Sequence, residues 1–277
     1  MSAHRVVLAL FALAAAGCSL IVEDEVGDLV TNLNAKRDVR VTLLDMHPHI
    51  GQYNDVQIIR PGDPSDPTSR SEVEARAILD PLPVGCFELF WPLGTSLAAT
   101  RVDFYADLNM DGAISPPGED HLWRRNLTTG ANGEGVLEFI HDTMFDDIGA
   151  DPAREPLGDL SVALTGIDDQ DGRLLVVSVT REFRETPGAP PQRTTPGILV
   201  VGAVEGGQVI RTLPGVLDQG SEYVVDFDFA EGARVCRGRV TAGAAGATVS
   251  SLDGFDCAVT DRRVVFRDVG PERRCVD

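Results

Sequence analysis

Side chains with oxygen atoms alternate along Asp107, Asn109 and Asp111, and Gly112 follows them directly. Calcium takes roughly six to eight oxygen ligands, and alternate residues of a tight turn can direct their oxygens at one centre. Gly112 permits the sharp turn, and the backbone carbonyl of Ala113 would add a further ligand. The spacing therefore predicts a calcium loop, and the alternative is a plain Asx turn that holds no ion.

This run resembles the front half of an EF-hand or dockerin-type calcium loop, but its back half departs from that pattern. Gly118 stands where an EF-hand has its bidentate Glu, and Pro116 and Pro117 oppose an exiting helix. The resemblance is therefore to the Asp-x-Asn-x-Asp-Gly turns that lie between strands in secreted bacterial modules. It implies that later residues close the shell, so the expected ligands are Asp107, Asn109, Asp111, the Ala113 carbonyl, Ser115, Glu119 and Asp120.

Four histidines, His47, His49, His121 and His141, form a second set of metal-binding side chains. In an antiparallel sandwich successive connections alternate between the two ends. The loop after the first predicted strand, the loop after the fifth and the end of the seventh therefore share one pole, which also carries the calcium loop. Two interpretations stay open. Either the histidines bond carbonyls and carboxylates to tie these loops together, or two or three of them bind zinc or copper, with His47-Pro48-His49 as the nucleus.

An internal repeat provides the elements that must position these residues. Residues 39–43 match residues 160–164 at a spacing of 121, and residues 102–104 match residues 225–227 at a spacing of 123. Trp123-Arg124 then match Cys236-Arg237 at a spacing of only 113. Ten residues are thus missing from the second copy, where 107–121 lie in the first. The calcium loop is an addition that the fold can do without, which favours a functional role for it.

Within each copy, apolar residues alternate over short runs bounded by Gly, Pro and Asp, as in half-buried strands. No segment has a sustained helical period, and only residues 73–79 are ambiguous. The pattern resembles an immunoglobulin or transthyretin-type sandwich. We expect an all-β chain of two tandem antiparallel β-sandwich domains of the same topology, at 37–152 and 157–268, with a tail at 269–277. Strands of the first copy are expected near 38–46, 53–60, 73–80, 85–91, 99–106, 121–128 and 135–141, and the last strand of the chain at 263–266.

The amino terminus has the pattern of an export signal, because Arg5 precedes an apolar run at 6–16 that is too short to cross a bilayer. The end of this run, Leu13-Ala14-Ala15-Ala16-Gly17-Cys18, resembles the lipobox of bacterial lipoproteins. The resemblance implies that residues 1–17 are removed, that Cys18 carries fatty acyl chains such as palmitate, and that 18–36 form an acidic tether. Ser19 points by analogy to the outer membrane, with the protein periplasmic or surface-exposed. Ordinary secretion is the alternative.

The charge of the chain argues against a nucleic-acid partner, and its cysteines suggest a disulfide. The formal net charge of −19 opposes nucleic-acid binding and suits divalent cations. In an oxidising envelope we expect Cys236 to pair with Cys257, because both lie in neighbouring predicted strands, and the alternative is that Cys275 takes either partner. Cys86 is expected to be a buried thiol.

The sequence contains no Gly-x-Ser-x-Gly elbow, no His-Glu-x-x-His motif and no phosphate-binding glycine loop. The first hypothesis is therefore a non-catalytic, lipid-anchored envelope protein in which a calcium-ordered pole of the first domain binds a protein or a polysaccharide. The alternative is a zinc- or copper-binding site, or a metalloenzyme, built on the four histidines.

Overall fold

The computed structural model describes residues 35–66, 68–111, 120–146, 158–184, 188, 191–229 and 234–270. These residues form strands β1 to β16 and two short 3-10 helices, η1 (His47–His49) and η2 (Asp168–Gln170). Within this part of the chain no helix has the length and apolar character that a membrane crossing needs. The expected all-β class is confirmed.

The first module packs two sheets, with strand orders β4-β1-β8-β7 and β3-β2-β5-β6, around one core. The buried indoles of Trp91 and Trp123 are its largest side chains. All seven expected strands are present, but the fourth, expected at 85–91, runs from Phe87 to Ser96, and the sixth is divided into β6 and β7. The strands are β1 (Lys36–Leu44), β2 (Tyr53–Arg60), β3 (Glu72–Asp80), β4 (Phe87–Ser96), β5 (Arg101–Asp107), β6 (His121–Asn126), β7 (Thr128–Thr129) and β8 (Gly135–Ile140).

The second module repeats this arrangement, with strand orders β12-β9-β15 and β11-β10-β13-β14. The expected shared topology is therefore confirmed. The pairing is not antiparallel throughout, because β1 pairs with β8, and β9 with β15, in parallel. The strands are β9 (Asp159–Thr165), β10 (Leu174–Phe183), β11 (Gln192–Ala203), β12 (Gln208–Leu213), β13 (Glu222–Phe229), β14 (Arg234–Thr241) and β15 (Gly246–Val249).

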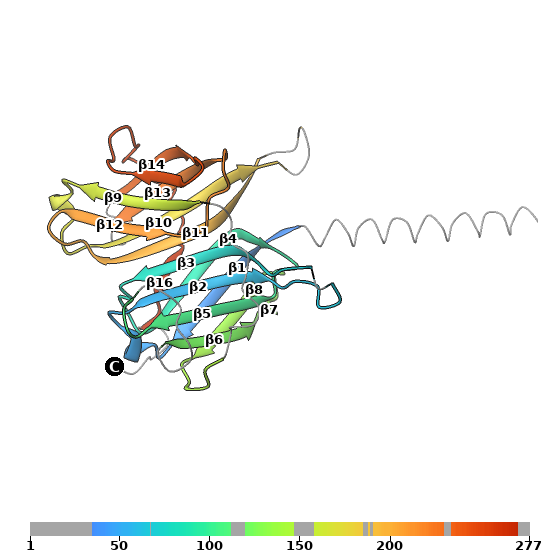
Figure 1. The fold of residues 1–277 in the computed structure, drawn as a ribbon. Coiled ribbons are helices and arrows are strands. Elements are labelled where there is room, and N and C mark those ends of the chain that lie inside the picture. Colours follow the sequence, from blue (N-terminus) through green and yellow to red (C-terminus); the bar gives the residue numbers. More distant parts are fainter. Residues whose placement is uncertain are drawn as a thin grey trace, which may run out of the picture.

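One sheet runs through both modules, because β3 and β11 pair in parallel at the junction (Figure 1). Ala77 of β3 packs in the core of the first module, whereas its neighbour Ile78 packs in the core of the second. Side chains alternate across a strand, so the two partner sheets cover opposite faces of this eight-stranded sheet. A strand buried on both faces loses its polar alternation, which explains why residues 73–79 were ambiguous in the sequence.

A buried arginine of the first module also bonds across the junction. Arg76 on β3 donates from Nε to both carboxylate oxygens of Asp55 at 3.0 Å, and its Nη1 donates to the carbonyl of Pro214 in the second module at 3.2 Å. Asp55 has 0% exposure. The modules are thus joined by backbone pairing and by the bond from Arg76, whose charge is balanced by Asp55 within the first module.

The last strand corrects the expected boundary of the second module. We expected a strand at 263–266 inside a domain that ended at 268, but β16 spans Phe266–Asp268 and pairs with β4 of the first module. Val265 lies in the first core, and the amide of Val269 donates to the carbonyl of Cys86 at 3.1 Å. The chain therefore returns to the first module after completing the second.

Equivalent ion pairs locate the extra residues of the first module. Arg124 donates to both carboxylate oxygens of Asp103 across β5 and β6, at 2.8 and 2.7 Å, and 21 residues separate the two. Arg237 and Asp226 form the same pair across β13 and β14, at 2.6 and 2.8 Å, but only 11 residues separate them. The difference of ten residues agrees with the offset between the two copies.

Candidate functional site

Three of the four expected histidines meet at one pole of the first module. His49 ends η1, His121 begins β6 and His141 directly follows β8. One ring nitrogen from each lies within 4.8 Å of the other two. We call these residues the histidine cluster and this end of the module the histidine pole. The expectation that strand order brings these imidazoles together is confirmed for these three.

The spacing within the histidine cluster is close to that of metal ligands. Nε2 of His49 lies 3.1 Å from Nε2 of His141, and the ring of His49 lies 5.2 Å from that of His121. A tetrahedral ion with metal–nitrogen bonds of about 2.0–2.1 Å separates its ligand nitrogens by about 3.3 Å. In addition, Nδ1 of His121 is buried and has no hydrogen-bond partner among the residues that the structure describes. Small rotations of the rings would therefore let all three imidazoles bind one ion.

A hydrogen bond with Gln52 assigns the tautomer of His49. Oε1 of Gln52 lies 2.9 Å from Nδ1 of His49 and accepts its N–H. In the neutral ring Nε2 of His49 then has a lone pair, so in the ion-free protein the proton between the two Nε2 atoms is on His141. This arrangement matches metal-bound histidines, whose second nitrogen commonly donates to an oxygen.

Aromatic rings enclose the histidine cluster. The buried indole of Trp123 lies 5.5 Å from the ring of His49, 5.6 Å from that of His141 and 5.8 Å from that of His121. Its Nε1 donates to the carbonyl of Asp142 at 3.2 Å, which fixes the segment after His141 against β6. Phe145 stacks on His121 with 3.8 Å between the ring centres. His49 is buried at 1% exposure, whereas His121 and His141 are half-buried.

The environment favours neutral imidazoles. Burial lowers the pKa of His49, and the neighbouring imidazoles of His141 and His121 lower it further, although the bond to Gln52 opposes the shift. Burial is also the largest cause that lowers the pKa of His121 and of His141, and it outweighs the nearby carboxylates Asp120 and Asp142. Neutral imidazole is the form that binds a metal ion, so little proton competition opposes loading near neutral pH.

His47 does not join the histidine cluster, which corrects the expected role of His47-Pro48-His49. A strand would direct residues two apart to one side, but these residues form η1, in which they point to different sides. The ring of His47 packs against Gly85, where an added Cβ would lie 2.5 Å from it.

A second group of potential ligands, Asp45, His47 and Cys86, is less suited to a metal ion. Cys86 is disulfide-bonded, so the expectation of a buried thiol is wrong and its sulfur is no thiolate ligand.

The calcium loop is described only in part. Asp107 and Asp120 are buried at the start and end of the loop, where the amide of Leu108 donates to Oδ1 of Asp120 at 3.1 Å. Oδ1 of Asp107 accepts the amide of Met110 at 2.6 Å, and Oδ1 of Asn109 accepts that of Asp111 at 3.0 Å. The bond from Asp111 to Asn109, two residues apart, is that of an Asx turn. The remaining expected ligands, Ala113, Ser115 and Glu119, lie outside the described residues.

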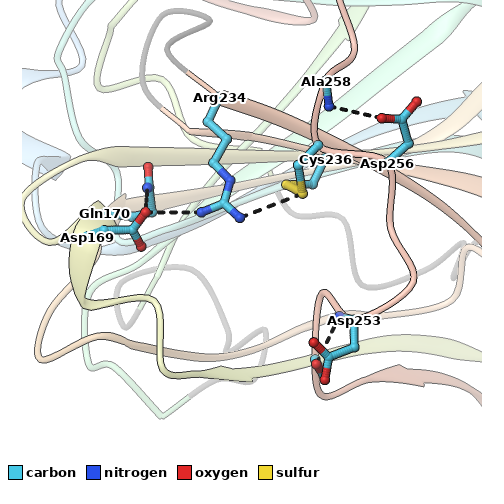
Figure 2. The surroundings of a disulfide bond; sticks show 9 residues. Asp169, Gln170, Arg234, Cys236, Asp253, Asp256 and Ala258 are labelled. Atoms are coloured by element: carbon cyan, nitrogen blue, oxygen red, sulfur yellow. Dashed lines mark hydrogen bonds and ion pairs between the residues drawn. A yellow bond between two sulfur atoms is a disulfide. The ribbon is translucent and has the colours of Figure 1, made fainter.

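The equivalent pole of the second module is held together by other chemistry. Cys236 and Cys257 form a disulfide, as expected, across 21 residues. Figure 2 shows Arg234 beside this bond, where its guanidinium donates to Asp169 at 3.1 Å and to the sulfur of Cys257 at 3.7 Å. By the repeat, Gln170 corresponds to His49 and Arg234 to His121. The second module thus has a covalent bond and an ion pair where the first has imidazoles.

The predicted lipid anchor is not described by the structure, and three residues around the histidine cluster were not predicted. Cys18 and the tether to residue 34 lie outside the described residues. Gln52 and the enclosing rings of Trp123 and Phe145 were not anticipated as parts of a site. The only sequence feature that could have indicated a role for Gln52 is its place as a polar residue directly after Gly51, close to His47-Pro48-His49.

No protein-family model matches the chain, and no curated protein matches it. Among solved structures it is similar to the shaft pilin SpaA of Lactobacillus rhamnosus GG. One variant of that pilin is 9% identical, with a TM-score of 0.22, over 82% of this chain and 100% of that chain. The unsubstituted pilin is 9% identical, with a TM-score of 0.21, over 78% of this chain and 96% of that chain. Scores this low identify no shared site, so the function has to be argued from the residues themselves.

Proposed function

We propose that the first module binds a divalent transition ion, zinc or copper, through His49, His121 and His141. The observation that carries the proposal is that one ring nitrogen of each lies within 4.8 Å of the other two. Imidazole suits zinc and copper, whereas magnesium and calcium prefer oxygen ligands. The lowered pKa values and the tautomer of His49 also match the form of the side chain that coordinates a metal.

The bound ion would hold the histidine pole together as the disulfide holds the second module. His49, His121 and His141 come from three separate segments, and an ion would join them at one centre. Cys236 and Cys257 likewise join β14 to the segment after β15. Because metal binding energy becomes folding energy when the site forms only in the folded state, an ion here would stabilise the first module.

The protein as a whole is proposed to be a non-catalytic envelope protein that binds a protein or polysaccharide at the histidine pole. Six large hydrophobic side chains are exposed in the described residues, and four of them, Ile50, Met110, Ile140 and Met144, lie in segments that meet at this pole. Exposed apolar groups that gather in one region favour a binding surface. The acidic chain makes nucleic acid an unsuitable partner.

The metal proposal is tested by purifying the protein in chelator, adding zinc or copper(II), and measuring bound metal by elemental analysis. We expect one ion per chain, and none in His49→Gln. His47→Gln is the matched control, since His47 comes from the same turn but lies outside the histidine cluster, and it should bind as the unsubstituted protein does. Full metal binding in His49→Gln would contradict the proposal.

Calcium remains a second proposal, supported by the burial of Asp107 and Asp120 at the start and end of the loop. Calcium added to a chelated sample should then raise the melting temperature of the first module, and Asp111→Ala should remove most of that rise. An equal response of both modules would contradict the assignment of the ion to this loop.

A lipid anchor at Cys18 is proposed from the lipobox resemblance. Mass spectrometry of the amino-terminal peptide from the expressed full chain should find an acylated Cys18, and Cys18→Ser should leave the protein unlipidated. An unmodified mature terminus at another residue would instead support ordinary secretion.

A further inference from the structure

Gln52 occupies a position that can control how His49 binds an ion. Its Oε1 accepts the Nδ1–H of His49 at 2.9 Å, and this is the bond that directs the lone pair of Nε2 toward His141. Without an acceptor at Nδ1, the proton of a neutral imidazole moves freely between its two nitrogens. The population of His49 that is ready to bind an ion would then decrease.

The backbone holds Gln52 in place independently of its side chain. The amide of Gln52 donates to the carbonyl of His49 at 3.1 Å, which closes the turn after η1. The carbonyl of Gln52 accepts the amide of Leu82 at 2.8 Å and Nδ2 of Asn54 at 3.2 Å. These three bonds do not need the side chain of Gln52, so Gln52→Leu and Gln52→Glu should leave the turn intact.

We propose that Gln52 is the positioning residue of the metal site, fixing His49 as a ligand through Nε2. This inference rests on the proposed function, because it concerns the same ion. Gln52 does not bind the metal. It acts through His49, as the hydrogen-bonded residues around other metal sites act through the ligands, where their loss typically weakens metal affinity by about 10-fold to 100-fold.

The arrangement also assigns a proton movement to His141. In the ion-free protein the Nε2–H of His141 donates to Nε2 of His49. The two Nε2 atoms can bind one ion together only after the proton has left Nε2 of His141. Transfer of the proton to Nδ1 of His141, by way of solvent at this half-buried side chain, frees its Nε2 lone pair. His49 needs no such change, because Gln52 already holds its proton on Nδ1.

The test compares zinc affinity in the full chain, measured at pH 7.5 by competition with a chromophoric chelator. Gln52→Leu should weaken binding by about 10-fold to 100-fold. Gln52→Glu offers a charged acceptor to the same Nδ1–H, so it should bind zinc more tightly than the unsubstituted protein. Gln208→Leu, on an exposed position of β12 in the second module, is the control for loss of a glutamine and should change nothing.

Two further measurements separate positioning from other effects. Thr143→Glu adds the same charge two residues from His141 at an exposed position, and it should not reproduce the gain of Gln52→Glu. The nitrogen-15 shifts of the ion-free protein should identify His49 as the Nδ1–H tautomer, and Gln52→Leu should lose this preference. If the unsubstituted protein binds zinc but both Gln52 variants bind it equally well, the inference is wrong. If the unsubstituted protein binds neither zinc nor copper, the proposed function itself fails.

Discussion

Nε2 of His49 lies 3.1 Å from Nε2 of His141, although 92 residues separate the two in the chain. The contact brings the turn after β1 against the end of β8, two strands that pair in parallel in one sheet. The amide of His141 also donates to the carbonyl of Leu44 at 2.9 Å, so the backbone sets this separation. The histidine pole is therefore fixed by the sheet and not by the loops alone.

Zinc should stabilise the first module selectively. At a free concentration 100 times the dissociation constant, binding contributes about 2.7 kcal/mol to the free energy of unfolding. For a module of this size the gain corresponds to a rise in melting temperature on the order of 10 °C. His121→Gln should abolish most of the rise, measured by differential scanning calorimetry or by hydrogen exchange in each module. A zinc-dependent gain confined to the second module would be incompatible with the site.

The ion-free first module should lose stability on mild acidification. Burial lowers the pKa of all three clustered imidazoles below that of an unfolded histidine. The unfolded chain then binds protons first as the pH falls below about 6.5, so stability is full above that pH and decreases below it. Denaturant unfolding from pH 7.5 to pH 5 checks this sign. A flatter pH profile is expected for His49→Gln, and an unchanged slope in that variant would assign the effect to other groups.

Copper(II) should quench the fluorescence of one tryptophan in particular. Trp123 lies within 5.8 Å of every ring of the histidine cluster, whereas the indole of Trp91 bonds to the carbonyl of Arg76 on β3. A titration of Trp91→Phe should retain strong quenching by one equivalent of copper, and Trp123→Phe should show little. Equal quenching in both variants would indicate copper bound elsewhere.

Loss of the charge pair at the junction should destabilise the chain. Arg76→Met leaves the carboxylate of Asp55 buried without its partner, which typically costs about 3–5 kcal/mol. The double variant Asp55→Asn with Arg76→Met removes both charges and should recover much of this loss. Urea unfolding of the two variants measures the difference. A double variant that is no more stable than Arg76→Met alone would show that the charge on Asp55 is not the cause.

The fold was largely predictable because most strands alternate. Strands with one polar face, such as β1 and β13, gave a clear period of two, and the repeat fixed their order. The pairing of β3 with β11 was not predictable, because double burial removes the alternation that reports on a strand's environment. Nor did the short run at β16 reveal which module it would join.

The site was predictable at the level of segments and not of side chains. The rule that successive connections alternate between the two ends of a sandwich correctly placed His49, His121 and His141 at one pole. The prediction that His47 joins His49 in one site was wrong, because the turn adopts a 3-10 helix in which side chains two residues apart point to different sides. Gln52 could not be found by motif, since its role depends on a single contact made by a loop side chain.

The return of β16 to the first module affects the order in which the nascent chain can mature. The edge of β4 that β16 covers stays open until the whole second module has been synthesised. An uncovered sheet edge invites pairing with other chains. Chains interrupted before residue 266 would thus keep this edge of β4 unpaired and open to association with other chains.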